Sequence, residues 1–362
     1  MTAIRVTLVA LLALSGLAAG CGGSPEPGPA EPDAESAPPD WRLLDVGSTV
    51  SMRGLSVVSE DVVWLSGAEG RFFRTADRGE TWQHGQVPGM ADVDFRDVEG
   101  VDERTAYLLS AGATARIYKT GDAGRSWVRQ YVTDAPGVFF DGMAFWDPEH
   151  GVAFSDPVDG RFLVIGTADG GSAWTELPAD ALPPPWPGEA GFAASGTNVA
   201  VHGDGVWIGT GGGAARVLHS ADRGQTWTAQ TTPMATGDGA GIFSLCFWDA
   251  RHGAIVGGSF REPDATAGTA AWTDDGGLTW TRAAAPPRGY RSGVAVVPGT
   301  DGPTLVAVGP TGTDVSFDAG RTWSARSDAG FNAVAFAGPE LGWAVGADGH
   351  AAIFEGPLAR PD

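Results

Sequence analysis

An eight-residue pattern occurs six times along the chain, and it strongly limits the folds that the chain can adopt. The pattern reads Ser or Thr, any residue, Asp, any residue, Gly, two further residues and Trp. The copies begin at positions 75, 120, 167, 220, 273 and 316, so the steps between them are 45, 47, 53, 53 and 43 residues. Repeats of this length are typical of β-propellers, in which each repeat forms one four-stranded blade.

Each copy of the pattern has the residues that a hairpin turn requires. The Asp side chain accepts hydrogen bonds from backbone N–H groups and closes the turn. Gly adopts a positive φ, and Trp begins the next strand and is large enough to pack between neighbouring blades. We therefore assign the six aspartates a structural role and no catalytic or metal-binding role; they are Asp77, Asp122, Asp169, Asp222, Asp275 and Asp318.

A second periodicity precedes the turns and predicts the innermost strand of each blade. The seven predicted openings are 52–55, 95–98, 140–143, 192–194, 243–245, 290–293 and 331–334. Seven openings against six turns leave the last blade without its outer strand. Residues 40–44 resemble the strand that follows each turn, with Trp41 in the Trp place. The sequence thus predicts an all-β, seven-bladed propeller over 41–356, closed by the N-terminal strand, with a tail at 357–362.

The first forty residues are not expected to belong to this fold. Residues 1–20 have one basic residue, an apolar run and small residues, as in a secretory signal peptide. The run ends in Leu17-Ala18-Ala19-Gly20-Cys21, which resembles a bacterial lipobox with Cys21 as the lipidated residue. Residues 21–40 are rich in Pro and acid and are expected to form a disordered tether. The alternative is ordinary signal cleavage with an unmodified Cys21.

The expected location is therefore the outer side of the cytoplasmic membrane, the periplasm or the outer membrane. The net charge of −21 argues against nucleic acid as a partner and against docking to anionic lipid, so membrane contact is expected only through the lipid anchor. We expect a monomer. Cys21 and Cys246 are not expected to form a disulfide, and Cys246 is predicted to be a small buried residue.

The six turns resemble the Asp-box, or bacterial neuraminidase repeat, of sialidases, sortilin-type receptors and xyloglucanases. The whole ring is more similar to bacterial propellers related to the photosystem II assembly and stability factor, a group in which some members bear "oxidoreductase" labels. The resemblance rests on the turns and on residues 95–97, 145–147, 155–160, 188–192 and 289–292. It implies a scaffold that binds protein partners.

The candidate ligand site lies at the mouth of the central channel. Aligning the seven openings puts these residues at one level: Arg53, Arg96, Asp141, Ala193, Ser244, Arg291 and Asn332. Arginine forks suit carboxylates and phosphates, so one interpretation is an acid-binding pocket. The other is a structural network in which the three arginines pair with Asp97, Asp141 and Asp156.

The insert at 178–190 contains three consecutive prolines that stiffen it. Trp186 and Glu189 are predicted to overhang the channel as a lid. The alternative is a rigid surface loop in which Trp186 packs on its neighbour.

Two functions remain open. The first is a binding or assembly module that presents its channel mouth to an envelope protein or a small anionic ligand. The second is a sialidase-like glycosidase, in which Tyr290, Glu189 and Asp156 would act against a substrate held by the arginines. The Phe-Arg-Ile-Pro signature expected in the first blade is replaced by Ser51-Met52-Arg53-Gly54. No cofactor is predicted, and no His or Cys cluster predicts a metal.

Overall fold

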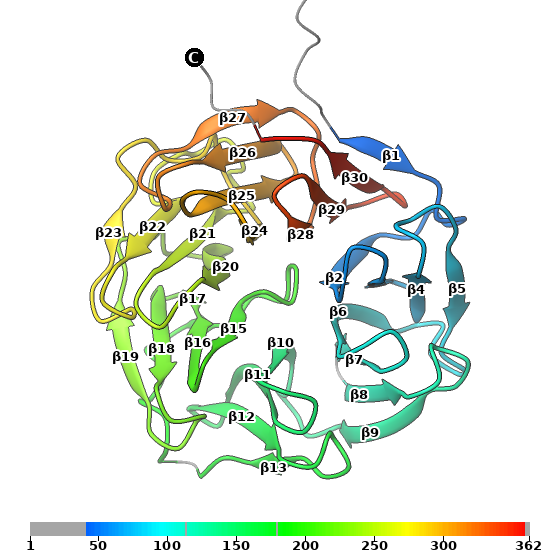
Figure 1. Ribbon diagram of the computed structural model, residues 1–362. Coiled ribbons are helices and arrows are strands. Elements are labelled where there is room, and N and C mark those ends of the chain that lie inside the picture. The colour runs from blue at the N-terminus through cyan, green and yellow to red at the C-terminus, as the bar shows by residue number, and fades with distance from the viewer. Residues whose placement is uncertain (1–40, 113, 179, 359–362) are drawn as a thin grey trace, which may run out of the picture. The chain divides into compact units, whose positions relative to one another are not determined.

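The computed structural model describes residues 41–112, 114–178 and 180–358, and these residues form strands and loops without a helix. Seven sheets are arranged around a central axis (Figure 1), which confirms the predicted seven-bladed, all-β propeller. No helix that could span a membrane is found among these residues. The predictions for 1–20, for Cys21 and the tether 21–40, and for 359–362 concern residues outside those that the structure describes.

Blades are numbered here in chain order. Blades 1 to 3 comprise β2 Met52–Val57, β3 Val63–Gly67, β4 Arg71–Thr75 and β5 Gln83–Gln86; β6 Asp94–Gly100, β7 Ala106–Ala111, β8 Ala115–Thr120 and β9 Val128–Thr133; and β10 Phe140–Phe145, β11 Gly151–Val158, β12 Arg161–Thr167 and β13 Thr175–Glu176. Blades 4 and 5 comprise β15 Val199–His202, β16 Gly205–Gly209, β18 Arg216–Ser220 and β19 Thr228–Thr231; and β20 Ala240–Phe247, β21 Gly253–Ser259, β22 Ala270–Thr273 and β23 Thr281–Arg282.

Blades 6 and 7 comprise β24 Gly293–Val297, β25 Thr304–Gly309, β26 Gly312–Ser316 and β27 Ser324–Ser327; and β28 Ala333–Gly338, β29 Leu341–Val345, β30 Ala351–Glu355 and β1 Arg42–Leu44. The N-terminal strand β1 is the outer strand of blade 7. It pairs antiparallel with β30, so that Arg42 lies opposite Ile353 and Leu44 lies opposite Ala351. The predicted closure of the ring by the N-terminal strand is confirmed.

In the repeated turns, the Asp side chains accept hydrogen bonds from backbone N–H groups of the same turn. In each of the six, the Asp carboxylate accepts the N–H of the residue four positions later at 2.8–2.9 Å. In the first, the Thr75 hydroxyl also accepts the Gly79 N–H at 2.9 Å. The hydrogen bonds to the carboxylates lower the pKa of Asp122 and of Asp222 to about 2, so these groups stay ionised.

Apolar clusters between neighbouring blades form the core. Each of seven such clusters contains one tryptophan from the same place in a blade: Trp41, Trp82, Trp127, Trp174, Trp227, Trp280 and Trp323. Trp41 lies edge-on to Phe331 and Phe354, with ring centroids 5.3 and 5.7 Å apart. The tryptophans of the repeats and Trp41, which directly precedes β1, therefore pack in the same way between blades.

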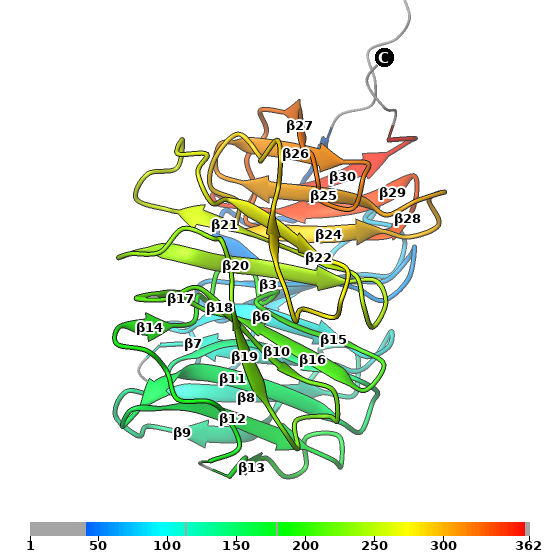
Figure 2. The ribbon, with the colours of Figure 1, turned by 90° about the vertical axis from the view of Figure 1, so that its left-hand side faces the viewer.

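One predicted inner strand is wrong. Residues 192–194 are not in the sheet of blade 4, whose inner strand is β15. These residues belong to a loop that follows β14 Glu189–Ala190. In the side view, β14 and β17 Gly211–Gly212 lie beside β20 and extend the sheet of blade 5 to six strands (Figure 2). An aromatic residue followed by small residues fits both an inner strand and this loop. The pattern at 192–194 therefore predicted a strand where the chain forms a loop.

Candidate binding site on the central axis

Four inner strands carry a β-bulge at the same level. The register shifts lie between Met52 and Gly54 in β2, and at the matching places in β6, β10 and β20. The residues at the bulges are Arg53, Arg96, Asp141 and Phe243. A bulge leaves its extra residue unpaired and re-aims the side chain. The predicted level is thus observed for Arg53, Arg96 and Asp141.

The predicted alignment is wrong for Arg291 and Ser244. One backbone hydrogen bond marks equivalent positions in three blades, because its acceptor is each time a glycine carbonyl near the end of the second strand of the preceding blade. The donors are the N–H groups of Met52, Arg291 and Phe331, at 2.9, 3.0 and 3.1 Å. Arg291 is therefore equivalent to Met52. Aromatic residues served as alignment marks in the sequence, but Tyr290 lies one position before the equivalent of Phe95, and Phe243 lies one position after it.

Arg291 consequently lies inside blade 6. Its side chain is fully buried, and its Nε donates to the Asp314 carboxylate at 2.6 Å, with a second bond from a terminal nitrogen. A further nitrogen donates to the Tyr290 carbonyl at 2.8 Å. The carboxylate partner Asp314 was not predicted from the sequence. This pair leaves Arg291 unable to meet a ligand on the axis.

Asp97 and Ser244 join neighbouring blades. The Asp97 carboxylate accepts the Met143 N–H at 2.7 Å, and the Ser244 hydroxyl accepts the Val294 N–H at 2.9 Å. Both acceptors therefore bridge to the inner strand of the next blade. Burial raises the pKa of Asp97 to about 7. Asn332 has a comparable role, because its Nδ2 donates to the Met52 carbonyl at 2.8 Å and so ties blade 7 to blade 1.

The loop of residues 191–198, named here the axial segment, projects toward the central axis just before β15 (Figure 1). The Ser195 hydroxyl donates to the Ser292 carbonyl at 2.8 Å, and the Thr197 hydroxyl lies 2.6 Å from that of Ser244. The Leu245 N–H donates to the Thr197 carbonyl at 2.9 Å. The second half of the axial segment is thus attached to blades 5 and 6.

Two glycines let the axial segment approach buried carboxyl groups. A Cβ on Gly196, which has a φ of +76°, would lie 2.1 Å from Asp97 Oδ1. A Cβ on Gly191 would lie 2.2 Å from Asp141 Oδ2. The Gly191 N–H donates to Asp156 at 2.8 Å. Only glycine fits at these two positions without displacing the acids.

Asp141 and Asp156 form an acidic pair under the axial segment. Asp141 is buried, and its Oδ2 has no hydrogen-bond partner within the described part of the chain. Burial, and then repulsion from Asp156, raise the pKa of Asp141 well above its usual value. Burial also raises the pKa of Asp156. These shifts favour the neutral acids and weaken their attraction for the arginines.

Arg53 and Arg96 lie next to each other, and only one of the two, Arg96, has a direct ion pair within the described part of the chain. Arg96 Nε donates to Asp94 at 2.8 Å, and one of its terminal nitrogens donates to the Ala193 carbonyl at 3.3 Å. Arg53 donates to the Ala194 carbonyl at 3.3 Å. Among the described residues, Arg53 has no carboxylate within ion-pair distance. Burial, and then repulsion from Arg96, lower the pKa of Arg53.

Tyr290 lies near Arg53 and belongs to a group of packed aromatic rings. Its ring meets Phe243 edge-on at 4.7 Å, and Phe243 stacks on Phe192 at 4.1 Å. Burial raises the pKa of the Tyr290 phenol, and the nearby Arg53 opposes this shift. A neutral phenol beside a guanidinium is a hydrogen-bond donor and acceptor, not an activated nucleophile.

Glu189 does not face Tyr290. Its carboxylate, fully buried, accepts bonds from Arg216 at 2.7 and 2.9 Å and from the Thr210 hydroxyl at 2.6 Å. Trp186 is 50% exposed, and its ring lies over the Arg216 guanidinium at 5.2 Å. The ion pair thus fixes the Pro-rich insert and holds Trp186 at the surface. Sequence reasoning missed Arg216 and Thr210, since no local pattern marks a pair 27 residues apart.

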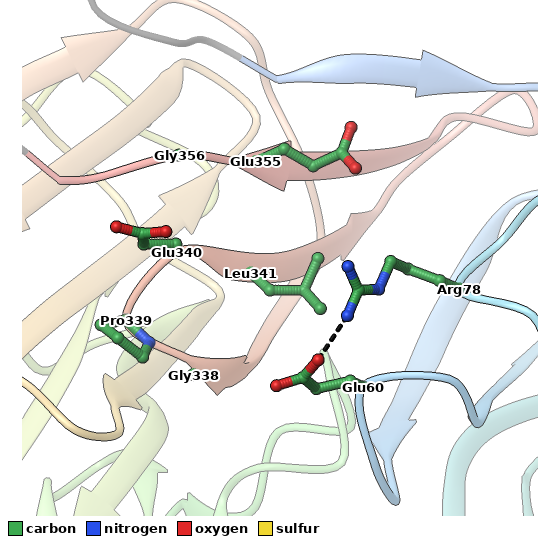
Figure 3. Close-up of a pocket in the computed structure, with 8 residues that line it drawn as sticks. All are labelled: Glu60, Arg78, Gly338, Pro339, Glu340, Leu341, Glu355 and Gly356. Atoms are coloured by element: carbon green, nitrogen blue, oxygen red, sulfur yellow. Dashed lines mark hydrogen bonds and ion pairs between the residues drawn. The ribbon is translucent and has the colours of Figure 1, made fainter.

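A separate pocket of about 430 Å³ lies at the seam between blade 7 and blade 1. Figure 3 shows the Glu60 carboxylate paired with Arg78 there, with Glu340 and Glu355 on other sides. None of the predicted ligand-binding residues lines it. Across 41–112, 114–178 and 180–358, no group of three or more His, Cys, Asp and Glu side chains is placed to hold a metal.

The fold is similar to those of solved propellers. YCF48 bound to D1 peptide matches with a TM-score of 0.63 and 16% identity, over 87% of this chain and 96% of that one. YCF48 from Cyanidioschyzon merolae gives 0.60 and 18%, over 87% and 98%. The WD40 domain of Neurospora crassa Pan2 gives 0.58 and 14%, over 92% and 93%. At these identities the likeness shows the fold alone.

The expected resemblance to photosystem II assembly factor propellers is confirmed at the level of the fold. No protein-family profile and no curated protein sequence matches the chain.

Proposed function

We propose that this protein is an exported, lipid-anchored binding module that holds a carboxylate of an envelope protein partner between Arg53 and Arg96. The observation that carries the proposal is the environment of Arg53. Its guanidinium is half-buried beside a second guanidinium, and the described chain supplies no carboxylate to pair with it. Asp94, the nearby acid, pairs directly with Arg96, so two partly buried cations share one carboxylate. A second, incoming carboxylate would therefore be bound favourably.

The partner is a protein segment in this proposal because the fold can hold one. The solved YCF48 propeller is bound to a D1 peptide. The same carboxylate chemistry is offered by a small organic acid, and the experiment below distinguishes the two sources. The proposal treats the six turns as Asp-box repeats, on the strength of their sequence and of their shared hydrogen bonds.

The anchor belongs to the same proposal. Residues 1–20 have the composition of a signal peptide, Cys21 follows a lipobox-like run, and 21–40 are rich in Pro and acid. A tethered propeller would meet partners at or near the membrane outside the cytoplasm.

A sialidase-like function is less well supported. Glu189 is engaged by Arg216, and Arg291 by Asp314, so neither is available to a substrate on the axis. Two arginines remain where the sialidase mechanism requires three.

A thermal-unfolding screen of the full-length protein tests the proposal. The probes are the acetylated peptide Ala-Leu-Ala with a free terminal carboxylate, the same peptide as an amide, glutarate and inorganic phosphate. We expect the free acid to raise Tm and the amide to have no effect. Glutarate acting as strongly as the peptide would identify a small acid as the ligand.

Two variants locate the effect. Arg53→Gln removes the proposed contact, and Arg261→Gln removes an exposed arginine that already pairs with Asp238. We expect binding to be about 10–100-fold weaker in Arg53→Gln, because one charged hydrogen-bond pair is lost. We expect no change of affinity in Arg261→Gln. Equal stabilisation of wild type and Arg53→Gln would overturn the proposal.

A further inference from the structure

We infer that the axial segment is a built-in competitor for the arginine site: its carbonyl groups occupy Arg53 and Arg96, and a bound carboxylate displaces residues 192–194. This inference rests on the proposed function and adds a regulation of that site.

A carboxylate at the arginines would replace two bonds to backbone carbonyls. Arg53 and Arg96 donate to the carbonyls of the consecutive residues Ala194 and Ala193, both at 3.3 Å. These bonds are longer than the usual range and have a neutral acceptor. Bonds between a guanidinium and a carboxylate are shorter and about twice as strong. A carboxylate ligand therefore has the advantage in a direct exchange.

The two halves of the axial segment are held by different contacts. Residues 195–198 are fixed by hydrogen bonds to Ser292, Ser244 and Leu245. Residues 192–194 are held by the two arginines and by the stack of Phe192 on Phe243. The two bonds to the arginines are the contacts that a carboxylate ligand would replace.

Gly191 directly precedes the displaced stretch and lies against Asp141 with no room for a Cβ. A glycine at this end allows the backbone there to change φ and ψ when 192–194 move. The same contact gives a way to release the stretch by mutation, since Gly191→Ala cannot keep its place against Asp141.

The experiment compares Gly191→Ala with Gly302→Ala. A Cβ on Gly302 would meet open space, with no heavy atom of another part of the chain within 4 Å, and its φ is not positive, so it is a matched control. Hydrogen exchange of residues 192–194 reports release of the stretch, and fluorescence anisotropy of the labelled acid-terminated peptide reports affinity. We expect faster exchange and at least about tenfold tighter binding in Gly191→Ala, with Gly302→Ala like wild type.

The outcomes separate the inference from the proposed function. Faster exchange in Gly191→Ala with unchanged peptide affinity would overturn the inference and leave the proposed function standing. A peptide that binds neither wild type nor Gly191→Ala would overturn both. If Gly191→Ala does not fold, exchange in the wild type decides: we expect the peptide to speed exchange of 192–194, and unchanged or slower exchange there would overturn the inference.

Discussion

Arg53 and Arg291 both belong to inner-strand segments, but their surroundings are opposite. Arg291 is wholly buried and shares the Asp314 carboxylate with Arg288. Arg53 lies at a bulge, half-buried, with Arg96 as its charged neighbour. A difference of one residue in strand register separates a structural ion pair from a candidate ligand site, because successive side chains point in opposite directions.

The buried pair predicts a large effect of removing its acid. Asp314→Asn leaves the Arg291 guanidinium charged inside blade 6, and we expect a loss of about 3–5 kcal/mol in the free energy of unfolding. Asp238→Asn, which breaks an exposed pair with Arg261, is expected to cost no more than about 1 kcal/mol. Urea denaturation measures both, and similar small losses would show that Arg291 does not depend on Asp314.

Asp97 predicts a pH dependence of stability. Burial raises its pKa in the folded protein to about 7, and burial and then repulsion from Asp97 raise the pKa of Glu99. Between pH 4 and 7 the folded state therefore holds a proton that the unfolded state has released, so stability falls as pH rises through this window.

The variant Asp97→Asn should remove the part of that slope that Asp97 contributes, while keeping an oxygen acceptor for the Met143 N–H. We expect it to gain stability over wild type on going from pH 4 to pH 7, by on the order of 4 kcal/mol. Urea titrations at several pH values measure the difference, with Asp301→Asn, an exposed acid, as the control. Parallel pH profiles for wild type and Asp97→Asn would contradict this assignment.

At the scale of elements, β1 completes the ring by putting Trp41 where the repeats put their tryptophans. Trp41→Ala should therefore cost up to about 3 kcal/mol, the low end for a large aromatic, because Trp41 is partly buried against the blade 7 core. Leu43→Ala, two residues further along in β1 and 62% exposed, should change stability by less than about 0.5 kcal/mol. Thermal unfolding compares them; equal effects would mean that β1 adds pairing without a core contact.

The blades, the turns and the closing strand could be predicted because each depends on residues close together in a repeated pattern. The axial segment could not, since its position depends on Asp97, Asp141 and Ser292, which come from three other blades. The same limit explains the missed partners of Glu189 and Arg291. The shared level of Arg53 and Arg96 could be predicted because their strands align without a shift in the sequence, and both residues lie at the bulge.

At the scale of the whole molecule, an acidic protein with a net charge of −21 places two adjacent arginines beside its axis. The seam pocket between blades 7 and 1 offers Glu60, Glu340 and Glu355 with Arg78. It would repel an acid unless Arg78 left Glu60. A carboxylate ligand is therefore expected to bind at the axial arginines and not in the seam pocket.

Titration calorimetry of the acid-terminated peptide with wild type, Arg53→Gln and Arg78→Gln tests the central claim most directly. We predict that Arg53→Gln weakens binding by about 10–100-fold and that Arg78→Gln binds as wild type does. Binding that survives Arg53→Gln but is lost in Arg78→Gln would contradict the claim, and would move the site from the axis to the seam.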